Sequence, residues 1–274
     1  GLMLANENAS KQAIAKFEKA VSLNPRFDEL HVKWGANLYI LKDYKEAEVH
    51  FRQAADLNPN NPETYSNCGA ALKALGALDE AIVKFEKSKE LDLSKAIEID
   101  VHLKEMYLAR GRRLREERKF LEAITKFKKT TDIDQKFGVG FFECGVTLAQ
   151  MGNYDASINQ FQKAVEVSPH LTDALTNWGI ALLELKRYDE AVTQFGLLLA
   201  RKPDHRDVDF LLGDAYLGLH KTVEAKEAFV RYLSKEPKGF YADRARKAIQ
   251  DMNDTAVVSP HSTTAKPSLT APDA

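Results

Sequence analysis

The residues able to bind a metal or act as nucleophiles are scattered along this 274-residue chain. Seven histidines are present, and no two of them have the HxxxH or HxH spacing of a metal site. The two cysteines, Cys68 and Cys144, form no CxxC pair. We therefore expect no metal, no cofactor and no enzymatic activity, and we interpret both cysteines as small buried side chains.

Two further stretches contain residue types that bind phosphate or nucleic acid in other proteins. Gly138 and Gly140, followed by Gly145, superficially match a dinucleotide-binding loop, but no strand precedes them and the repeat described below accounts for Gly145. The basic stretch from Arg110 to Lys119 is interrupted by two glutamates and lacks interleaved aromatic residues. This stretch is either a solvated face with internal ion pairs or a patch for an acidic partner.

The bulk composition argues against several classes of protein. Lys and Arg total 39 and Asp and Glu total 40, so the net charge of -1 gives no general attraction to nucleic acid or an acidic membrane. No apolar run approaches the roughly 18 residues of a membrane span, so we expect no direct membrane insertion. The start of the chain has no basic region typical of a signal peptide. Because two cysteines do not make a disulfide framework, the composition fits a reducing compartment, and we expect a cytoplasmic protein.

The strongest signal is an internal repeat. A small residue followed four positions later by phenylalanine occurs seven times, and a glycine precedes each phenylalanine by sixteen positions. The pairs are Ala13 and Phe17, Ala47 and Phe51, Ala81 and Phe85, Ala123 and Phe127, Ser157 and Phe161, Ala191 and Phe195, and Ala225 and Phe229. The glycines are Gly1, Gly35, Gly69, Gly111, Gly145, Gly179 and Gly213. A proline follows eight residues after most of the phenylalanines, for example Pro25 and Pro59.

This pattern resembles the tetratricopeptide repeat (TPR) family, whose 34-residue unit has the form W-x2-L-G-x2-Y, A-x3-F and P. The first-helix signatures are Trp34-Gly35-x-x-Leu38, Cys68-Gly69-x-x-Leu72, Cys144-Gly145-x-x-Leu148, Trp178-Gly179-x-x-Leu182 and Leu212-Gly213-x-x-Tyr216. The resemblance covers roughly residues 1–239 and implies an all-α fold, a right-handed solenoid of helical hairpins. The glycine and the small residue allow two helix axes to approach within about 8–10 Å, and proline ends the second helix.

One interval between phenylalanines is 42 residues instead of 34, which inserts about eight residues, Ala96 to Leu103. Their apolar residues alternate as in a strand, but they lie between helical segments. We expect a helical extension, with a loop insertion as the alternative. Eight residues make about two helical turns, so we also expect the array to bend there.

The register divides the chain into five parts. They are an N-terminal lobe of one truncated and two complete hairpins (1–95), the insertion (96–103), a C-terminal lobe of four hairpins (104–239), a capping helix (240–253) and a Ser/Thr/Pro/Ala-rich tail (254–274). The composition of the tail predicts disorder in isolation. Because Gly1 already stands at the eighth position of a repeat, we expect a fragment of a longer protein. One hypothesis for the tail is that it lies in a groove, its own or a neighbour's, as a ligand would.

In TPR proteins the first helices of successive repeats line a concave groove, and the resemblance assigns this chain's partner-binding residues by position. They are Val32, Ala36, Tyr39, Ile40, Ser66, Ala70, Lys73, Arg112, Arg115, Phe142, Val146, Gln150, Thr176, Ile180, Leu183, Phe210, Asp214 and Leu217. Exposed apolar side chains require a cover, so we expect a protein or peptide segment with apolar and acidic residues as the partner. Val32 and Ala36 replace the Lys and Asn of the chaperone-binding subtype, which argues against a chaperone clamp.

The expected function is a scaffold that binds partner segments in this groove. Two alternatives stay open. One is a self-assembling structural protein, which would be a homo-oligomer, and the other is the TPR region of a larger enzyme such as a glycosyltransferase.

Overall fold

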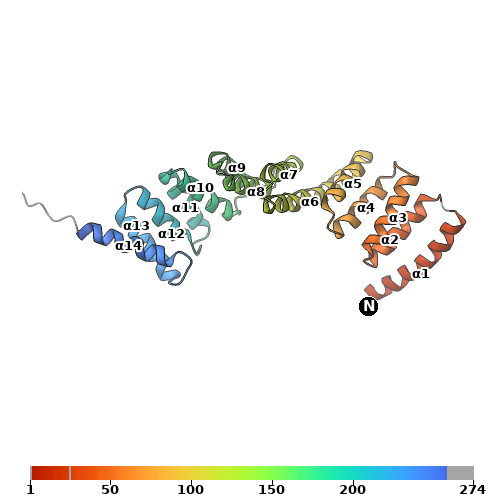
Figure 1. Ribbon diagram of the computed structural model, residues 1–274, viewed down its shortest axis with the longest axis horizontal. Helices are drawn as coiled ribbons and strands as arrows, with labels where there is room; N and C mark the ends of the chain where they lie inside the picture. The colour runs from red at the N-terminus through yellow and green to blue at the C-terminus, as the bar shows by residue number, and fades with distance from the viewer. Residues whose placement is uncertain (1, 25, 258–274) are drawn as a thin grey trace, which may run out of the picture. The chain divides into compact units, whose positions relative to one another are not determined.

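The computed structural model describes residues 2–24 and 26–257, which contain fourteen α-helices, one short 3-10 helix and no strand (Figure 1). This confirms the all-α prediction. The chain forms two compact units, Gly1–Leu171 and Thr172–Ala274. The lobe boundaries that the register places around 96–103 stay a prediction.

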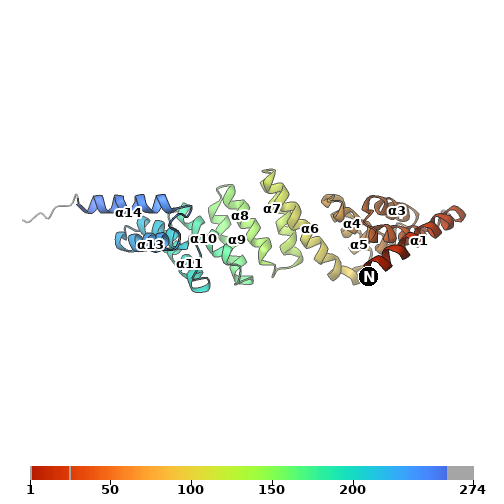
Figure 2. The same cartoon turned by 90° about the horizontal axis from the view of Figure 1, so that it is seen from below.

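The first unit consists of helix α1 (Leu2–Leu23) followed by four antiparallel hairpins (Figures 1 and 2). The hairpin helices are α2 (Asp28–Ile40) and α3 (Tyr44–Leu57), α4 (Pro62–Ala74) and α5 (Leu78–Leu91), α6 (Ala96–Glu116) and α7 (Phe120–Ile133), and α8 (Gly138–Gln150) and α9 (Tyr154–Val167). The two helices of a hairpin pack on each other, and the second helix also packs on the first helix of the next hairpin.

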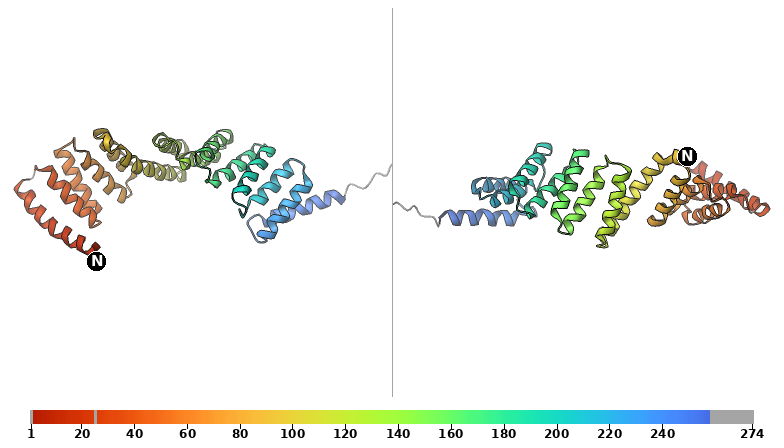
Figure 3. Two further views of the ribbon diagram at one scale, coloured as in Figure 1. Left: turned by 180° about the vertical axis from the view of Figure 1, so that it is seen from behind. Right: turned by 90° about the horizontal axis from the view of Figure 1, so that it is seen from above.

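The second unit repeats this arrangement with two hairpins and a final helix (Figure 3). Its helices are α10 (Thr172–Glu184), α11 (Tyr188–Arg201), α12 (Val208–Gly218), α13 (Thr222–Lys235) and α14 (Ala242–Val257). Helix α14 packs on α13, at the place in the register of a further first helix. Its polar residues Asp243, Arg246 and Lys247 stand at the positions where the other first helices pack on their second helices, so α14 is suited to cap the unit.

Local sequence explains where the helices begin. Asp43 and Asn61 accept hydrogen bonds from the backbone N–H groups of Glu46 and Glu63, at 3.3 and 3.0 Å, and thereby cap α3 and α4. Pro62 then occupies the first turn of α4, where its missing N–H costs nothing. The turn inside each hairpin needs a residue with positive φ, which is glycine in two hairpins and a larger residue in the other four. These residues are Gly76, Gly152, Lys42, Arg118, Lys186 and His220.

The core follows the repeat register. The phenylalanines of the six hairpins are 0–1% exposed, and the small residue four positions before each is fully buried. A β-carbon on the glycine sixteen positions earlier would lie 2.3–2.8 Å from the phenylalanine ring in every hairpin. The glycine therefore makes room for the ring, as the register predicts.

The insertion is helical. A 3-10 turn, η1 (Leu93–Lys95), leads into residues 96–103, which form the first two turns of α6. Ile99 and Leu103 in these turns are buried and belong to the same core as Phe85. The expected bend of the array stays a prediction.

Two ends of the array differ from the expected elements. Residues 2–23 form one continuous helix, not a truncated hairpin. Continuing α1 through residues 2–8 satisfies their backbone hydrogen bonds within one helix. At the other end α14 extends to Val257, four residues past the expected limit of 253. Residues 258–274, and with them the hypothesis of a tail in a groove, lie outside the described residues.

Candidate protein-binding groove

A pocket of about 470 Å³ lies on the face formed by the first helices of the second unit. Helices α10, α12 and α14, the turn between α10 and α11, the first residue of α11 and the turn before α14 supply its walls. The lining residues are Ile180, Leu183, Glu184, Lys186, Tyr188, Phe210, Leu211, Asp214, Tyr241 and Arg244.

The apolar part of this pocket is built from three successive first helices. Ile180 is 36% exposed and Leu183, one turn later on α10, is half-buried. Phe210 of α12 is buried, and the ring of Tyr241, in the turn just before α14, stacks on it at 4.3 Å, nearly parallel. Leu211, also buried, completes this part of the lining. A partner side chain would therefore meet Ile180, Leu183 and Tyr241, with Phe210 beneath them.

The charged part of the pocket is an ion pair between two first helices. Asp214 of α12 and Arg244 of α14 are 3.4 Å apart. Burial raises the pKa of Asp214, and the nearby Arg244 only partly opposes this rise. The Arg244 guanidinium also lies 4.9 Å from the centre of the Phe210 ring. The pair offers a carboxylate acceptor and guanidinium donors to the backbone of a bound segment.

Four of the residues expected from the groove positions line this pocket, namely Ile180, Leu183, Phe210 and Asp214. Phe210 is buried, so it supports the pocket from below and is not itself open to a partner. The other two expected residues of this unit, Thr176 and Leu217, are half-buried and lie outside the pocket lining. The hydroxyl oxygen of Thr176 lies 3.4 Å from Nε2 of His205.

The sequence analysis did not assign Tyr241 and Arg244 to the groove, because it applied the repeat register only to the residues before the capping helix. Arg244 stands 34 residues after Phe210, at the same repeat position. Extending the count one repeat further would have placed Arg244 in the groove and Tyr241 beside it. The capping helix thus supplies part of the candidate site.

In the first unit the expected charged groove residues are already paired. Lys73 of α4 lies 2.7 Å from Glu105 of α6. Arg112 and Arg115 of α6 both lie 2.5 Å from the carboxylate of Glu143, which is 5% exposed. Ion pairs internal to the basic stretch are formed by Glu117, which lies 3.6 Å from Arg110 and 2.8 Å from Lys119. An acidic partner would have to compete with Glu143.

The remaining expected residues of the first unit differ in accessibility. Val32 is buried, so its side chain belongs to the packing and its assignment as a contact for a partner is corrected. The half-buried residues are Ala36, Ser66, Ala70, Phe142 and Val146, and the exposed ones are Tyr39, Ile40 and Gln150. Gln150 lines a shallow pocket of about 320 Å³ with Arg115, Arg118 and Phe120.

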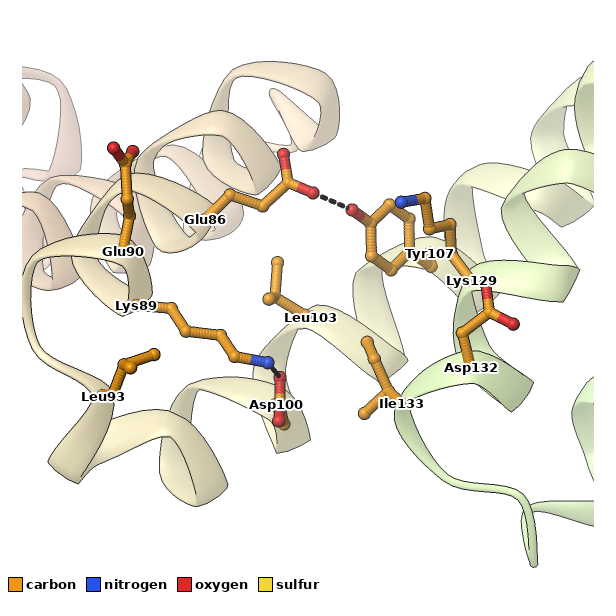
Figure 4. Close-up of a pocket in the computed structure, with 10 residues that line it drawn as sticks. All are labelled: Glu86, Lys89, Glu90, Leu93, Asp100, Leu103, Tyr107, Lys129, Asp132 and Ile133. Carbon is orange, nitrogen blue, oxygen red and sulfur yellow. Dashed lines mark hydrogen bonds and ion pairs between the residues drawn. The ribbon is translucent and has the colours of Figure 1, made fainter.

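A third pocket, of about 520 Å³, is lined by residues of α5, η1, α6 and α7 (Figure 4). Asp100 and Leu103, which belong to the insertion, form part of its wall. Lys89 lies 2.5 Å from Asp100, and the Tyr107 hydroxyl donates a hydrogen bond to Glu86 (Figure 4). Several of its polar groups are therefore satisfied within the chain.

Neither a metal site nor a membrane span is found in the described parts of the chain. No group of three or more His, Cys, Asp or Glu residues lies close enough together there to hold a metal ion. Among the described helices, none combines the length and the apolar character that a membrane crossing requires. Cys68 and Cys144 are both buried, as expected.

Comparison with known proteins supports the repeat assignment. A TPR repeat model matches residues 35–76, and a tetratricopeptide repeat model matches residues 145–206 and 176–239. No curated protein matches the chain.

Two solved structures with TM-scores above 0.5 show the same fold. The C-terminal part of a TPR repeat-containing protein from Cytophaga hutchinsonii aligns with a TM-score of 0.57 and 17% identity, over 89% of this chain and 96% of that one. The Naa15/Naa10 complex bound to HypK-THB gives a TM-score of 0.61 and 12% identity, over 93% of this chain and 40% of that one. The APC/C hetero-tetramer Cut9-Hcn1 gives 0.48 and 16%, over 91% and 48%. The present chain thus spans less than half the length of these last two. From its register, its hairpins and these matches, the chain belongs to the tetratricopeptide repeat family, whose arrays typically serve as non-catalytic protein-interaction scaffolds.

Proposed function

We propose that this chain is a scaffold that holds a segment of a partner protein against the first-helix face of its second unit. The observation that carries the proposal is the pocket between α10, α12 and α14, where Ile180 and Leu183 remain accessible beside Tyr241. A pocket lined by accessible apolar side chains and a few polar groups is the usual form of a binding site.

The lining indicates what such a segment would carry. An apolar side chain fits the space between Ile180 and Tyr241, because burial there removes apolar surface from water on both sides. Asp214 and Arg244 would hydrogen-bond the backbone or a polar neighbour of that side chain. The expectation of an acidic partner has less support, because Arg112 and Arg115 both already pair with Glu143, whose single negative charge offsets one of their two positive charges.

The proposal can be tested with peptides selected from a random 12-residue library on the intact chain. We expect selected peptides, measured by fluorescence anisotropy, to bind Ile180→Glu at least tenfold more weakly than wild type. A charge in the pocket would have to be desolvated by the apolar side chain of the ligand. The matched control is Ile97→Glu, which makes the same change at an isoleucine of α6 that is 85% exposed.

Equal binding to wild type, Ile180→Glu and Ile97→Glu would overturn the proposal, provided that circular dichroism shows the same helix content for all three. Light scattering over a range of concentrations distinguishes the proposed scaffold from the alternative, a self-assembling structural protein. A mass that rises with concentration, and does so in wild type but not in Ile180→Glu, would assign the pocket to a second copy of the chain instead.

A further inference from the structure

Asp214 is an acid at a groove position where the other hairpins carry different residues. It directly follows Gly213, and the residues that follow the corresponding glycines of the other five hairpins are neutral or basic. They are Ala36, Ala70, Arg112, Val146 and Ile180. The side chain of Asp214 is nevertheless only 30% exposed. The packing of the repeat therefore does not account for a carboxylate at this position.

The carboxylate of Asp214 is incompletely paired. Its Oδ2 accepts a hydrogen bond from Nη2 of Arg244 at 3.4 Å, whereas ion pairs with a good hydrogen bond usually measure about 2.7–2.9 Å. The side chain of Arg244 is 65% exposed, so water competes for its charge. Among the described residues, no donor to the other oxygen, Oδ1, is found. One oxygen of a partly buried carboxylate is thus left for a donor from outside the chain.

Two more deeply buried carboxylates show how this chain compensates such a charge. Glu143 lies 2.5 Å from each of two arginines, and Asp209 lies 3.1 Å from Arg231 and 2.8 Å from Lys235. Asp214 has a single cation, at a longer distance. Burial consequently raises the pKa of Asp214, and Arg244 offsets only part of that rise. By comparison with the other two, Asp214 lacks a second cation.

The pocket lining places an apolar contact one first helix away from Asp214. Ile180 occupies on α10 the repeat position that Asp214 occupies on α12, and these two helices contact each other. Packed helix axes lie about 8–10 Å apart, and an extended segment covers about 3.3 Å per residue. Side chains about two or three residues apart in such a segment can therefore contact Ile180 and Asp214 together. The other charged residues of the lining, Glu184 and Lys186, are exposed and of opposite sign, so they add no net charge.

We propose that the segment held in this pocket carries a lysine or arginine that pairs with Asp214, about two or three residues from the apolar side chain that contacts Ile180. The inference rests on the proposed function and specifies the chemistry of its partner. Oδ1 of Asp214 accepts a hydrogen bond from the ammonium or guanidinium group, which supplies the second cation. The aliphatic part of the basic side chain lies along the apolar lining.

The probes are the peptides selected on the intact chain from the random 12-residue library. Lysine or arginine should recur in them, two or three positions from an apolar residue. Replacing that lysine with norleucine, or that arginine with citrulline, removes the charge and keeps most of the shape. In fluorescence anisotropy we expect this replacement to weaken binding to wild type by about tenfold or more, because hydrogen bonds to charged groups are among the stronger single contacts.

The variant Asp214→Asn distinguishes pairing with the partner from a structural role of Asp214. The charged and the neutral peptide should bind this variant with affinities within about twofold of each other. A carboxylate that only held α14 in place would affect both peptides equally, so the ratio of their affinities would not change. Asp243→Asn is the matched control, because Asp243 is fully exposed and lies outside the pocket lining. It should keep the full preference for the charged peptide.

An equal preference for the charged peptide in wild type and Asp214→Asn would overturn the inference. Selected peptides without a basic residue near the apolar one would also overturn it. Either result leaves the proposed function in place as long as Ile180→Glu still weakens binding. Peptides whose binding does not depend on Ile180 would overturn the proposed function, and this inference with it.

Discussion

A β-carbon placed on Gly179 of α10 would lie 2.3 Å from Cε1 of Phe195 in α11, closer than any relaxed contact. Gly179 is buried and Phe195 is fully buried, so neither has free space to move into. Gly179 is helical, and the glycine is needed for the room it leaves and not for its backbone freedom. The two helices of this hairpin can approach each other only because no side chain stands between them.

We predict that Gly179→Ala destabilises the chain by about 1–3 kcal/mol, the usual cost of overpacking a filled core. Alanine gains up to about 1 kcal/mol in helix propensity, which offsets only part of this cost. Urea denaturation followed by circular dichroism measures the difference. Gly196 of α11 is the matched control, because nothing lies within 4 Å of its added β-carbon. Gly196→Ala should therefore stabilise the chain, by up to about 1 kcal/mol. Equal effects of the two substitutions would contradict this account.

The second prediction concerns Glu143, the buried carboxylate between Arg112 and Arg115. Removing the carboxylate leaves two arginines that have some access to water, whereas removing both arginines leaves a buried charge without a partner. We predict that the double variant Arg112→Gln and Arg115→Gln loses about 3–5 kcal/mol of unfolding free energy, and that Glu143→Gln loses clearly less. Denaturant titration of both variants shows which of them loses more unfolding free energy. The reverse order would mean that Glu143 is solvated in solution.

The third prediction follows from the histidine pair in the first hairpin. The Nδ1 atoms of His31 and His50 are 3.2 Å apart and both rings are buried. Trp34 stacks on His50 at 4.0 Å. Burial, and then the charge on His31, lower the pKa of His50, while Glu46 and Gln53 partly oppose this. One ring can donate its hydrogen to the other only while at least one Nδ1 is unprotonated.

In the folded chain the pKa of His50 lies below the value of about 6.5 that an exposed histidine has. Below pH 6.5 the unfolded chain therefore binds more protons than the folded chain does. We therefore predict that the melting temperature falls as the pH drops from 7.5 to 5.5. His50→Gln should reduce that fall. Burial also lowers the pKa of His205, so a smaller dependence should remain in the variant. A fall of equal size in wild type and His50→Gln would refute the assignment to this pair.

The fourth prediction is that neither cysteine is reactive in the folded chain. Burial raises the pKa of Cys68 to about 11 and that of Cys144 to about 12. At pH 8 fewer than about one thiol in a thousand would be ionised, and access is blocked as well. Ellman's reagent should therefore label both cysteines in urea and neither on the same time scale in buffer. Fast labelling of one cysteine in buffer would show that its hairpin opens locally.

Much of the fold could be predicted because each landmark has one packing role that recurs. The spacing of glycine and phenylalanine specifies six hairpins, and the 42-residue interval indicates the extension of α6. The continuous helix α1 could not be read in this way. The repeat register places the residues that follow Gly1 in a first helix, whereas the structure joins them to the second helix, and no landmark of the 34-residue pattern distinguishes the two arrangements.

The candidate site was less predictable, because a groove position says where a residue points and not what covers it. Phe210 stands at a groove position, but Tyr241 of the capping helix stacks on it. Arg112 and Arg115 are at groove positions too, and their pairing with Glu143 depends on a residue of the next hairpin. Such contacts between hairpins are set by side-chain conformations that a 34-residue pattern does not contain.

The last prediction concerns Asp214 in the groove pocket. Its pKa is raised because the site is partly withdrawn from water, and the exposed Arg244 at 3.4 Å compensates only in part. The folded chain therefore holds this proton to a higher pH than the unfolded chain does. Between the ordinary aspartate pKa, about 3.9, and the raised value, the wild-type unfolding free energy loses a contribution as the pH rises. Asp214→Asn cannot ionise and avoids this loss.

As the pH rises through this window, we expect the unfolding free energy of wild type to fall relative to that of Asp214→Asn. Above the window the difference between the two proteins should stay constant. Urea denaturation at a series of pH values from 3.5 to 8 measures it. Asp243→Asn is the matched control, since Asp243 on α14 is fully exposed and pairs with Arg246 one turn away. A difference between Asp214→Asn and wild type that does not change with pH would mean that Asp214 is as well solvated in the folded chain as in the unfolded one. A raised pKa, by contrast, means that a cationic group brought by the partner would stabilise the ionised form of Asp214 beyond what Arg244 provides.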